Sequence, residues 1–108
     1  MNISNLRTSS GDFRILQTTE RTQTATITLK KGETTSDGFN SHPHSDQTVV
    51  VLEGEFLAEV GDERHALRSG QSLIIPAGTK HRLRNEREAT AFAFTLYAPP
   101  AYETDGPQ

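Results

Sequence analysis

Hydrophobic and polar residues alternate one by one along several short stretches of the chain. Between residues 23 and 30, threonines recur at every second position, and the positions between them hold Ala25, Ile27 and Leu29. A strand that packs one face on a core and turns the other to water has this period of two. The alternation therefore predicts a half-solvated antiparallel strand in this stretch.

The same pattern, with the turn residues that interrupt it, predicts seven further strands. Their expected ranges are 12–18, 47–53, 56–60, 64–67, 73–75, 81–85 and 90–97. The second of these is apolar at four consecutive positions, from Val49 to Leu52, so it should lie centrally in a sheet. In the last, Phe92, Phe94 and Leu96 share one face and are expected to point inward.

No stretch shows helical periodicity. Short strands separated by turn signals every ~8–12 residues indicate an all-β sandwich or barrel. A chain of 108 residues has room for a single domain, 1–108, with its core at about 12–98. We expect residues 1–11 to form a loose arm or an exchanged edge strand, and the polar tail to cover an edge or fray.

Composition narrows the class of protein. Only 32% of the residues are hydrophobic and the mean hydropathy is -0.61, so apolar side chains must gather on one face of each strand. Burying an outer face in a homodimer would help so small a domain, and we expect that assembly. A net charge of -3 and an isoelectric point of 5.7 argue against nucleic-acid binding.

Cysteine is absent, which excludes disulfides, thiol nucleophiles and cysteine-based metal sites. Nitrogen and oxygen ligands must therefore hold any metal. No apolar run approaches the roughly 20 residues that span a bilayer, and the first residues lack the apolar core of a signal peptide. We therefore expect a cytoplasmic protein with no membrane partner.

The stretch from Gly70 to Asn85 carries the first candidate for chemistry. Its buried-type strand is stopped by Pro76 and turned by Gly78, so a new strand begins near His81. Alternation from this point puts His81 and Asn85 on the inner face and the neighbouring arginines on the outer one. The turn thus delivers one imidazole to the interior.

Two further histidines, His42 and His44, flank Pro43. Proline favours extended backbone at the residue before it, so both imidazoles are expected on one face of an extended segment. If that segment faces the strand of His81, three imidazoles can share a divalent ion such as Zn, Fe, Mn or Ni. The alternative is a polar cluster that holds no metal. The fourth histidine, His65, is expected on the surface.

Together these two stretches resemble the cupin superfamily. The family's second motif is matched at every fixed position, by Gly70, Pro76, Gly78, His81 and Asn85. The first motif is matched by His42, His44 and Gly54, with Gln47 where a glutamate is expected, whereas Gly38 stands four positions before His42 rather than six. Two ordered motifs are more specific than either alone.

The resemblance implies a jelly-roll barrel, the double-stranded β-helix of cupins, with a divalent metal held by His42, His44, Gln47 and His81. A regular strand would send Gln47 to the face opposite His44, so the backbone should bulge or turn at Ser45–Asp46. Without such an irregularity, water or Asp46 would be the fourth ligand. Gln47 is equally compatible with a hydrogen-bonding role beside the metal.

Replacing the family's glutamate by glutamine changes the charge of the expected site. Three neutral imidazoles and an amide oxygen leave a divalent ion with its full charge of about +2, against about +1 with a carboxylate ligand. A more positive site attracts anionic ligands more strongly. We therefore expect a small ligand that carries a carboxylate or similar oxyanion.

Three classes of function follow. The first is a metal-dependent enzyme acting on a sugar, uronate or keto acid by isomerisation, ring opening or oxygenation, a range that the resemblance implies. The second is a ligand-binding or sensor protein without catalysis, which the lack of an evident general base favours. The third is a structural barrel that needs no metal.

The stretch from Arg64 to Arg87 is rich in cations. It holds Arg64, Arg68, Lys80, Arg82, Arg84 and Arg87, with Glu86 as its one acid. Alternation points Arg82 and Arg84 away from His81, which favours a solvated outer face. A dimer contact or an entrance that steers anions are the alternatives.

Overall fold

The computed structural model describes residues 3–7, 13–36, 38 and 41–103, and these residues form eight strands and no helix. The strands are β1 (Phe13–Thr18), β2 (Gln23–Leu29), β3 (Asp46–Glu53), β4 (Glu55–Val60), β5 (Glu63–Arg68), β6 (Ser72–Ile75), β7 (His81–Arg84) and β8 (Ala91–Ala98). Each expected strand is present, and its ends lie within one residue of the prediction. No helix long and apolar enough to cross a membrane occurs in this described part of the chain.

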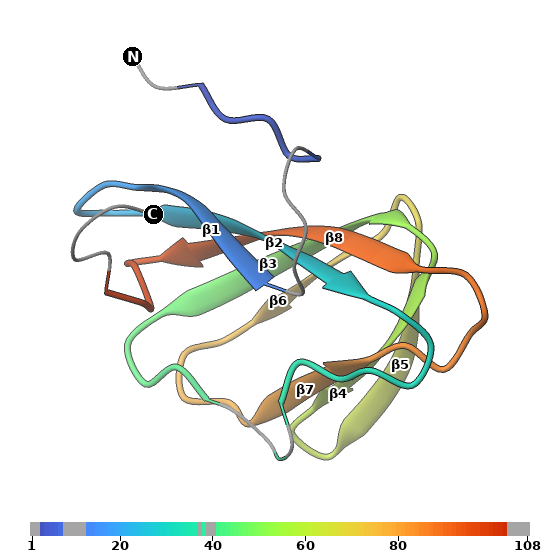
Figure 1. The fold of residues 1–108 in the computed structure, drawn as a ribbon. Coiled ribbons are helices and arrows are strands. Elements are labelled where there is room, and N and C mark those ends of the chain that lie inside the picture. Colours follow the sequence, from blue (N-terminus) through green and yellow to red (C-terminus); the bar gives the residue numbers. More distant parts are fainter. Residues whose placement is uncertain (1–2, 8–12, 37, 39–40, 104–108) are drawn as a thin grey trace.

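The strands form two antiparallel sheets that face each other (Figure 1). The larger sheet has the order β1-β2-β8-β3-β6, and the smaller has the order β5-β4-β7. β3 lies between β8 and β6, so the continuous apolar run from Val49 to Leu52 is central, as predicted. The arrangement confirms the all-β jelly-roll prediction.

The hydrophobic core lies between the two sheets. Its largest fully buried members include Leu29, Phe56, Ile75 and Leu83, which come from both layers. Their large side chains fill part of the space between the layers. The same layer of side chains forms one wall of the pocket described below.

The predicted orientation of β8 is wrong. Ala91 and Ala93 belong to the core cluster between the sheets, and Phe94 lies half-buried on the opposite face. The register pairs Ala93 with Ile27 on one side and Val51 on the other, both of which are core residues. Because large side chains from facing strands occupy the interior, the inner face of β8 accommodates small residues there. Side-chain size alone therefore suggested the wrong face.

Two motif residues have structural roles. Gly54 joins β3 to β4 with φ of 74°, and a Cβ atom there would lie 2.6 Å from the carbonyl oxygen of Thr90. Asn85 is fully buried, and its Nδ2 donates to the carbonyl oxygens of Leu29 and Ala89, each at 2.9 Å. These contacts tie the end of β7 to the end of β2 and to the segment that leads into β8.

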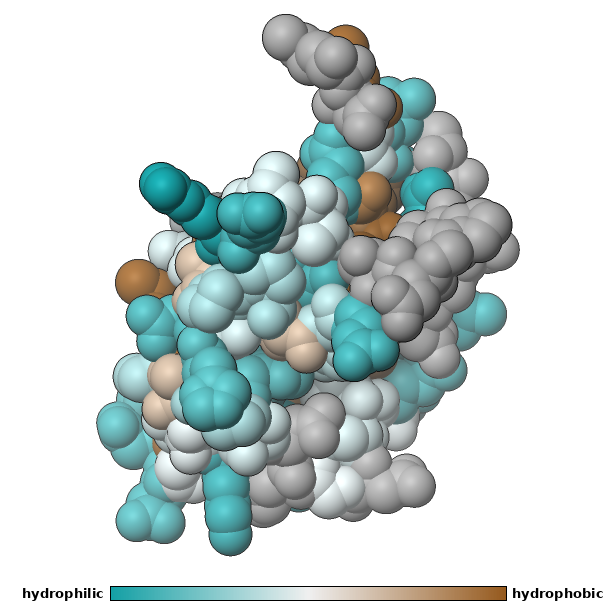
Figure 2. All heavy atoms as spheres, turned by 90° about the vertical axis from the view of Figure 1, so that its left-hand side faces the viewer, coloured by the Kyte–Doolittle hydropathy of each residue, from teal (hydrophilic) through white to brown (hydrophobic). Residues whose placement is uncertain are grey.

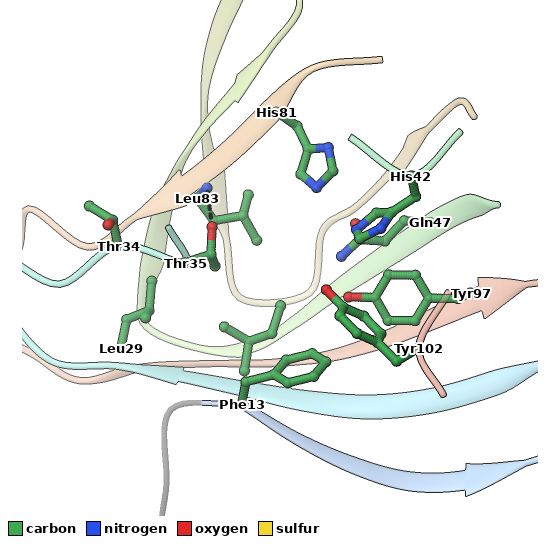
Figure 3. A pocket seen from close by; sticks show the side chains of 11 residues that line it. Phe13, Leu29, Thr34, Thr35, His42, Gln47, His81, Leu83, Tyr97 and Tyr102 are labelled. Carbon is green, nitrogen blue, oxygen red and sulfur yellow. Dashed lines mark hydrogen bonds between the residues drawn. The ribbon is translucent and has the colours of Figure 1, made fainter. Parts of the chain in front are cut away.

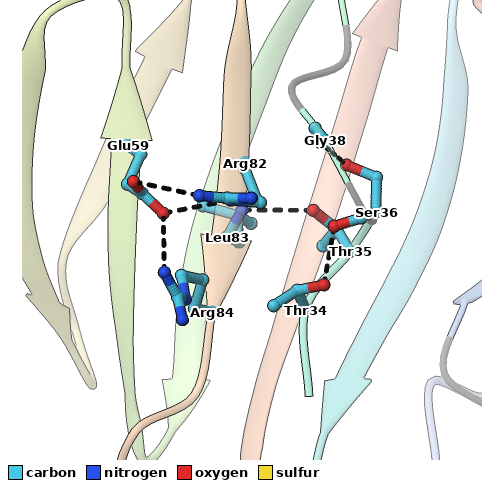
Figure 4. A network of polar contacts seen from close by, with 8 residues as sticks. All are labelled: Thr34, Thr35, Ser36, Gly38, Glu59, Arg82, Leu83 and Arg84. Atoms are coloured by element: carbon cyan, nitrogen blue, oxygen red, sulfur yellow. Dashed lines mark hydrogen bonds and ion pairs between the residues drawn. The ribbon is translucent and has the colours of Figure 1, made fainter. Parts of the chain in front are cut away.

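Residues after β2 return along β7 and extend the smaller layer. The amide of Thr35 donates to the carbonyl of Leu83 at 2.9 Å, and the Leu83 amide donates to Thr35 Oγ1 at 3.1 Å (Figure 4). A single bridge also pairs Thr34 with Arg84. These bonds hold Thr34 and Thr35 against the interior space.

The predicted cationic stretch lies mainly over the smaller sheet and is partly neutralised there. Glu59 accepts hydrogen bonds from Arg82 and forms an ion pair with Arg84 (Figure 4). Glu55 pairs with Arg68 and Arg87. None of the six cations in this stretch lines the pocket between the sheets. The structure thus supports the outer-face interpretation rather than an entrance that steers anions.

Candidate ligand and metal site

A pocket of about 360 Å³ lies between the two sheets. Its size falls within the range of small-molecule sites. Side chains from both layers and from the tail point into it (Figure 3). The lining residues are Phe13, Ile27, Leu29, Thr34, Thr35, His42, Gln47, His81, Leu83, Tyr97 and Tyr102.

The turn between β6 and β7 holds the segment that carries His42. The Gly78 amide donates to the carbonyl oxygen of His42 at 2.9 Å, and the Ala77 amide donates to Asp46 Oδ1 at 2.9 Å. The glycine of one motif thus contacts the histidine of the other directly. Asp46 caps this turn, so the structure gives its Oδ1 a partner other than a metal.

The expected extended segment over His42 and His44 is absent. Pro43 and His44 form a turn, closed by a 3.4 Å hydrogen bond from the Ser45 amide to the carbonyl of His42. The turn separates the two imidazoles: His42 lines the pocket, whereas His44 is exposed and does not. The backbone irregularity expected at Ser45–Asp46 therefore occurs earlier, and β3 is regular at Gln47.

His81 lies at the start of β7 and is only 5% exposed. Its Nδ1 lies 3.1 Å from the carbonyl oxygen of Thr79. Because a carbonyl oxygen only accepts, Nδ1 carries the proton in this contact, which leaves the Nε2 lone pair free. Burial lowers the pKa of His81 despite the opposing effect of the Thr79 contact, so the ring is neutral near pH 7.

His42 reaches the same space from the segment that precedes β3. Its ring centroid lies 5.1 Å from that of His81. Burial, and then the charge of His81, lower the pKa of His42. Two neutral imidazoles therefore stand together, which is the protonation state that a metal ion requires.

Gln47 provides the strongest indication of a ligand. The side chain is 2% exposed, and its Nε2 donates to Thr95 Oγ1 at 3.0 Å. Thr95 Oγ1 in turn donates to the carbonyl of Thr48 at 3.0 Å, so it must accept from Gln47. This chain fixes the orientation of the amide and leaves the buried Gln47 Oε1 without a hydrogen-bond partner.

Two tyrosines complete the polar end of the pocket. Tyr97 comes from β8, and Tyr102 follows it in the tail; their rings lie 5.3 Å apart, and each ring contacts His42. The two hydroxyls lie beside each other at this end of the pocket (Figure 3). Burial raises the pKa of both phenols, so both keep their protons at neutral pH. The alternation expected in the last strand turns Tyr97 outward, and Tyr102 lies beyond that strand, so no periodic pattern pointed to either residue.

The remaining lining is mostly apolar. Ile27, Leu29 and Leu83 belong to the core, and Phe13 extends this wall toward Tyr102, with ring centroids 5.0 Å apart. The pocket thus has a polar end and an apolar wall. The surface at the end of the molecule that carries the β6–β7 turn is mainly hydrophilic, with only small apolar areas (Figure 2).

The donor set fits a first-row divalent ion in part. Two neutral imidazole nitrogens and one unpaired amide oxygen are available, and such ligands suit Zn, Fe, Mn and Ni. Among the residues that the structure describes, no group of three or more histidine, cysteine or acidic side chains could hold a metal. The glutamine is therefore essential to any three-ligand set, and His44 is not positioned to join it. His65 is exposed beside Glu63, as expected for a surface residue.

Comparison with protein families gives a match to the cupin domain over residues 25–97. The relatives include proteins from Streptomyces. Protein SchB of Streptomyces halstedii is 38% identical over 63 residues, 58% of this chain and 44% of its own length. The polyketide synthase CurC of Streptomyces cyaneus is 34% identical over 74 residues, 66% of this chain and 47% of its own length. The chain thus spans about half the length of these relatives.

A solved structure with the same architecture is an RmlC-like cupin family protein from Methanocaldococcus jannaschii, described as a double-stranded β-helix. The two share 20% sequence identity with a TM-score of 0.79, over 92% of this chain and 91% of the other. At this identity the likeness concerns the fold alone. It agrees with the two facing antiparallel sheets seen here.

Proposed function

Because the chain belongs to the cupin family, we propose that its pocket binds a divalent metal ion through His42, Gln47 and His81 and holds a small polar metabolite there. The observation that carries the proposal is the unpaired Oε1 of Gln47 beside two neutral imidazoles. A buried acceptor left unpaired costs about 1–3 kcal/mol. A bound cation, or a hydrogen-bond donor on a ligand, removes that cost.

The proposed ligand is a metabolite with a carboxylate or similar oxyanion, such as a uronate or keto acid. No acidic side chain is among the described residues that line the pocket, so a divalent ion would keep its full positive charge. When bound, the metal would polarise a carbonyl or hydroxyl of the ligand. Phe13, Leu29 and Leu83 would shield the carbon skeleton from water.

Catalysis is the second candidate function, and the pocket lining favours ligand binding over it. If both imidazoles serve as metal ligands, the described lining has no carboxylate, lysine or further histidine that could act as a general base. The name of CurC, a polyketide synthase, supports the alternative that this chain also takes part in small-molecule synthesis. Enzymes that isomerise, open or oxygenate small metabolites fall within this alternative.

The first experiment measures metal. Protein purified without an affinity tag is analysed for its elemental content, and calorimetry then gives the affinity for Zn²⁺ and Mn²⁺. His42→Ala and His81→Ala should each lose metal. His44→Ala is the matched control, and it should keep metal because His44 is exposed and outside the pocket. Equal retention of metal by all three variants would refute the proposed ligand set.

The charge argument predicts the behaviour of Gln47→Glu. A carboxylate at this position should hold the divalent ion about tenfold or more tightly and weaken the binding of carboxylate ligands, because the net site charge falls by one. Calorimetry with metal, and then with pyruvate, measures both effects. Gln71→Glu adds the same charge on an exposed turn and should change neither. Unchanged affinities in Gln47→Glu would contradict the charge argument.

Catalysis is tested separately from binding. The metal-loaded protein is incubated with a panel of uronates, keto acids and catechols, and products are followed by chromatography. Turnover that disappears in His81→Ala identifies an enzyme. Saturable binding of the same compounds without turnover identifies the ligand-binding function.

A further inference from the structure

The segment that directly follows β8, residues 99–103, is fixed to the barrel by a buried side chain. Gln23, on β2, is fully buried. Its Oε1 accepts from the amides of Ala101 at 3.2 Å and Tyr102 at 3.0 Å, and its Nε2 donates to the carbonyl of Tyr102 at 2.9 Å. One glutamine thus makes three hydrogen bonds to the backbone of two tail residues.

A second buried side chain holds the same segment from the other side. Ser45 is 3% exposed, and its Oγ donates to the carbonyl of Pro100 at 3.3 Å. Ser45 directly precedes β3 and closes the turn that carries His42. The tail is therefore attached both to β2 and to the segment that supplies a proposed metal ligand.

These attachments place the Tyr102 ring inside the ligand site. Its centroid lies 5.0 Å from Phe13, 5.5 Å from His42 and 5.3 Å from Tyr97. The hydroxyls of Tyr97 and Tyr102 point toward the space shared with the two imidazoles (Figure 3). Tyr102 thus connects the apolar wall of the pocket with its polar end.

We propose that Tyr102 is a specificity-determining residue whose hydroxyl donates to the oxyanion of the bound ligand, and that Gln23 is the positioning residue that holds it there. This inference rests on the proposed function of the pocket, and it names the group that selects an acidic ligand. The described part of the tail, residues 99–103, is then a wall of the binding site.

The hydrogen-bond inventory of the pocket supports this role. The two adjacent phenols carry two protons, and a bond between the hydroxyls would use one of them, so at least one proton can be donated to a ligand. The imidazole lone pairs and Gln47 Oε1 are acceptors and cannot bind a carboxylate oxygen directly. The tyrosine pair is therefore a neutral donor that the pocket lining offers to an oxyanion, in addition to the proposed cation, the N–H of neutral His42 and the threonine hydroxyls.

The binding test compares two probes of similar shape, benzoate and benzyl alcohol, by NMR chemical-shift titration of the protein as isolated. Tyr102→Phe keeps the ring and removes the hydroxyl. This variant should lower the affinity for benzoate about tenfold, because a hydrogen bond to a charged group contributes about that factor. Benzyl alcohol should lose clearly less, since a bond between neutral groups is about half as strong. Equal losses for both probes, or no loss for benzoate, would overturn the role of Tyr102.

The positioning test uses amide hydrogen exchange, which needs no ligand. In the wild type the amides of Ala101 and Tyr102 should be protected, because they donate to buried Gln23. Gln23→Met keeps the side-chain volume but removes the acceptor, so both amides should exchange faster. The affinity for benzoate should also fall, as in Tyr102→Phe. Thr18→Val is the matched control, because it removes the other partner of Gln23 Nε2 without touching the tail. Unchanged exchange in Gln23→Met would overturn the positioning role.

A second variant covers the case in which Gln23→Met fails to fold. Ser45→Ala removes the bond to Pro100 and should speed the exchange of the same two amides to a smaller extent.

The outcomes also separate this inference from the proposed function. If the wild type binds benzoate and metal but Tyr102→Phe binds both equally well, only the inference fails. If the wild type binds no carboxylate at all, the carboxylate proposal and the role of Tyr102 both fail.

Discussion

At the scale of single residues, the site depends on the orientation of one amide. Gln47 could present either its oxygen or its nitrogen to the pocket, and Thr95 decides between them. The Thr95 hydroxyl donates its one proton to the carbonyl oxygen of Thr48, so toward Gln47 it can only accept a hydrogen bond. A fully buried threonine on β8 thus determines what Gln47 presents to a ligand.

Thr95→Val should therefore weaken metal binding without altering any proposed ligand. The valine has nearly the same shape but cannot accept from Gln47 Nε2, so the amide loses its fixed orientation. Loss of a supporting contact of this kind typically costs 10–100-fold in metal affinity, and we expect about that range. Calorimetry with Zn²⁺ measures it. Thr28→Val, on the opposite face of the same sheet, should retain wild-type affinity; a similar decrease there would show that the effect is not specific.

At the scale of elements, turns hold the two sheets in register around the pocket. The turn of Gly78 binds the backbone of His42, and the turn of Gly54 packs against the start of β8. Both glycines have positive φ, 80° and 74°, but only Gly54 lies in a crowded place. These two conditions have different energetic consequences.

Gly54→Ala should destabilise the protein more than Gly70→Ala. Both positions have left-handed backbone, which costs a non-glycine residue about 1–2 kcal/mol. At Gly54 the added Cβ would also lie 2.6 Å from Thr90 O and 2.9 Å from Ala91 Cα, which adds about 1–3 kcal/mol of strain. At Gly70 no atom lies within 4 Å. Denaturant unfolding measures both variants, and equal losses would contradict the steric argument.

Glu59, on the smaller sheet, should make the free energy of unfolding depend on pH in the acid range. Hydrogen bonds from Arg82, and then the charges of Arg82 and Arg84, lower the pKa of Glu59 below 4.5. Between pH 4.5 and that lowered value the unfolded chain takes up a proton that the folded chain does not. The contribution of Glu59 is therefore present above pH 4.5 and is lost as the pH falls through the folded pKa.

Glu59→Gln should lower the free energy of unfolding at neutral pH and flatten its decline in acid. The expected loss at neutral pH is about 1 kcal/mol, the upper range for partly exposed ion pairs. Denaturant midpoints at neutral pH and at several values below pH 4.5 measure the change. Part of the acid dependence should persist, because Glu55 has a lowered pKa of the same sign. Glu20→Gln, in the exposed β1–β2 turn, should leave the profile unchanged.

At the scale of the whole molecule, the outer face of the larger sheet is apolar and threonine-rich at its centre. Thr26, Val50 and Phe94 pair across it, and Ile74 on β6 is 62% exposed. An isologous contact sets each residue near a symmetry-related copy of itself, so a charged centre would repel. Its cations lie toward β1, where Arg14 pairs with Thr26 and Arg7 covers the Phe92 ring, whereas Val50 and Ile74 toward β6 are apolar; we propose that a second copy of the chain contacts this apolar side.

We expect the chain to form a homodimer through this face. Ile74→Glu should shift the protein toward monomer, because it places like charges in the proposed contact while the exposed site leaves the protomer fold intact. Light scattering coupled to size-exclusion chromatography measures the mass. Leu57→Glu, on the outer face of the smaller sheet, should leave the dimer in place. A wild type that is monomeric at all concentrations would refute the expectation.

The sequence by itself determined the strands, their ends and the turns that join them. Alternation, glycine and proline act over a few residues, so their effects do not depend on the rest of the molecule. Through two ordered motifs, the sequence also predicted that His42 and His81 lie together. The predicted position of Asn85 at a strand end follows from the same motif spacing.

Only the tertiary structure decided which face of β8 is inside, that His44 lies outside the pocket and that Tyr102 lies within it. β8 is apolar on both faces, so the choice depends on the volume that other strands leave free. The turn at Pro43–His44 is held by the distant amide of Gly78. Tyr102 is held by Gln23, 79 residues earlier in the chain. Contacts over such separations depend on the packed fold, and no local pattern encodes them.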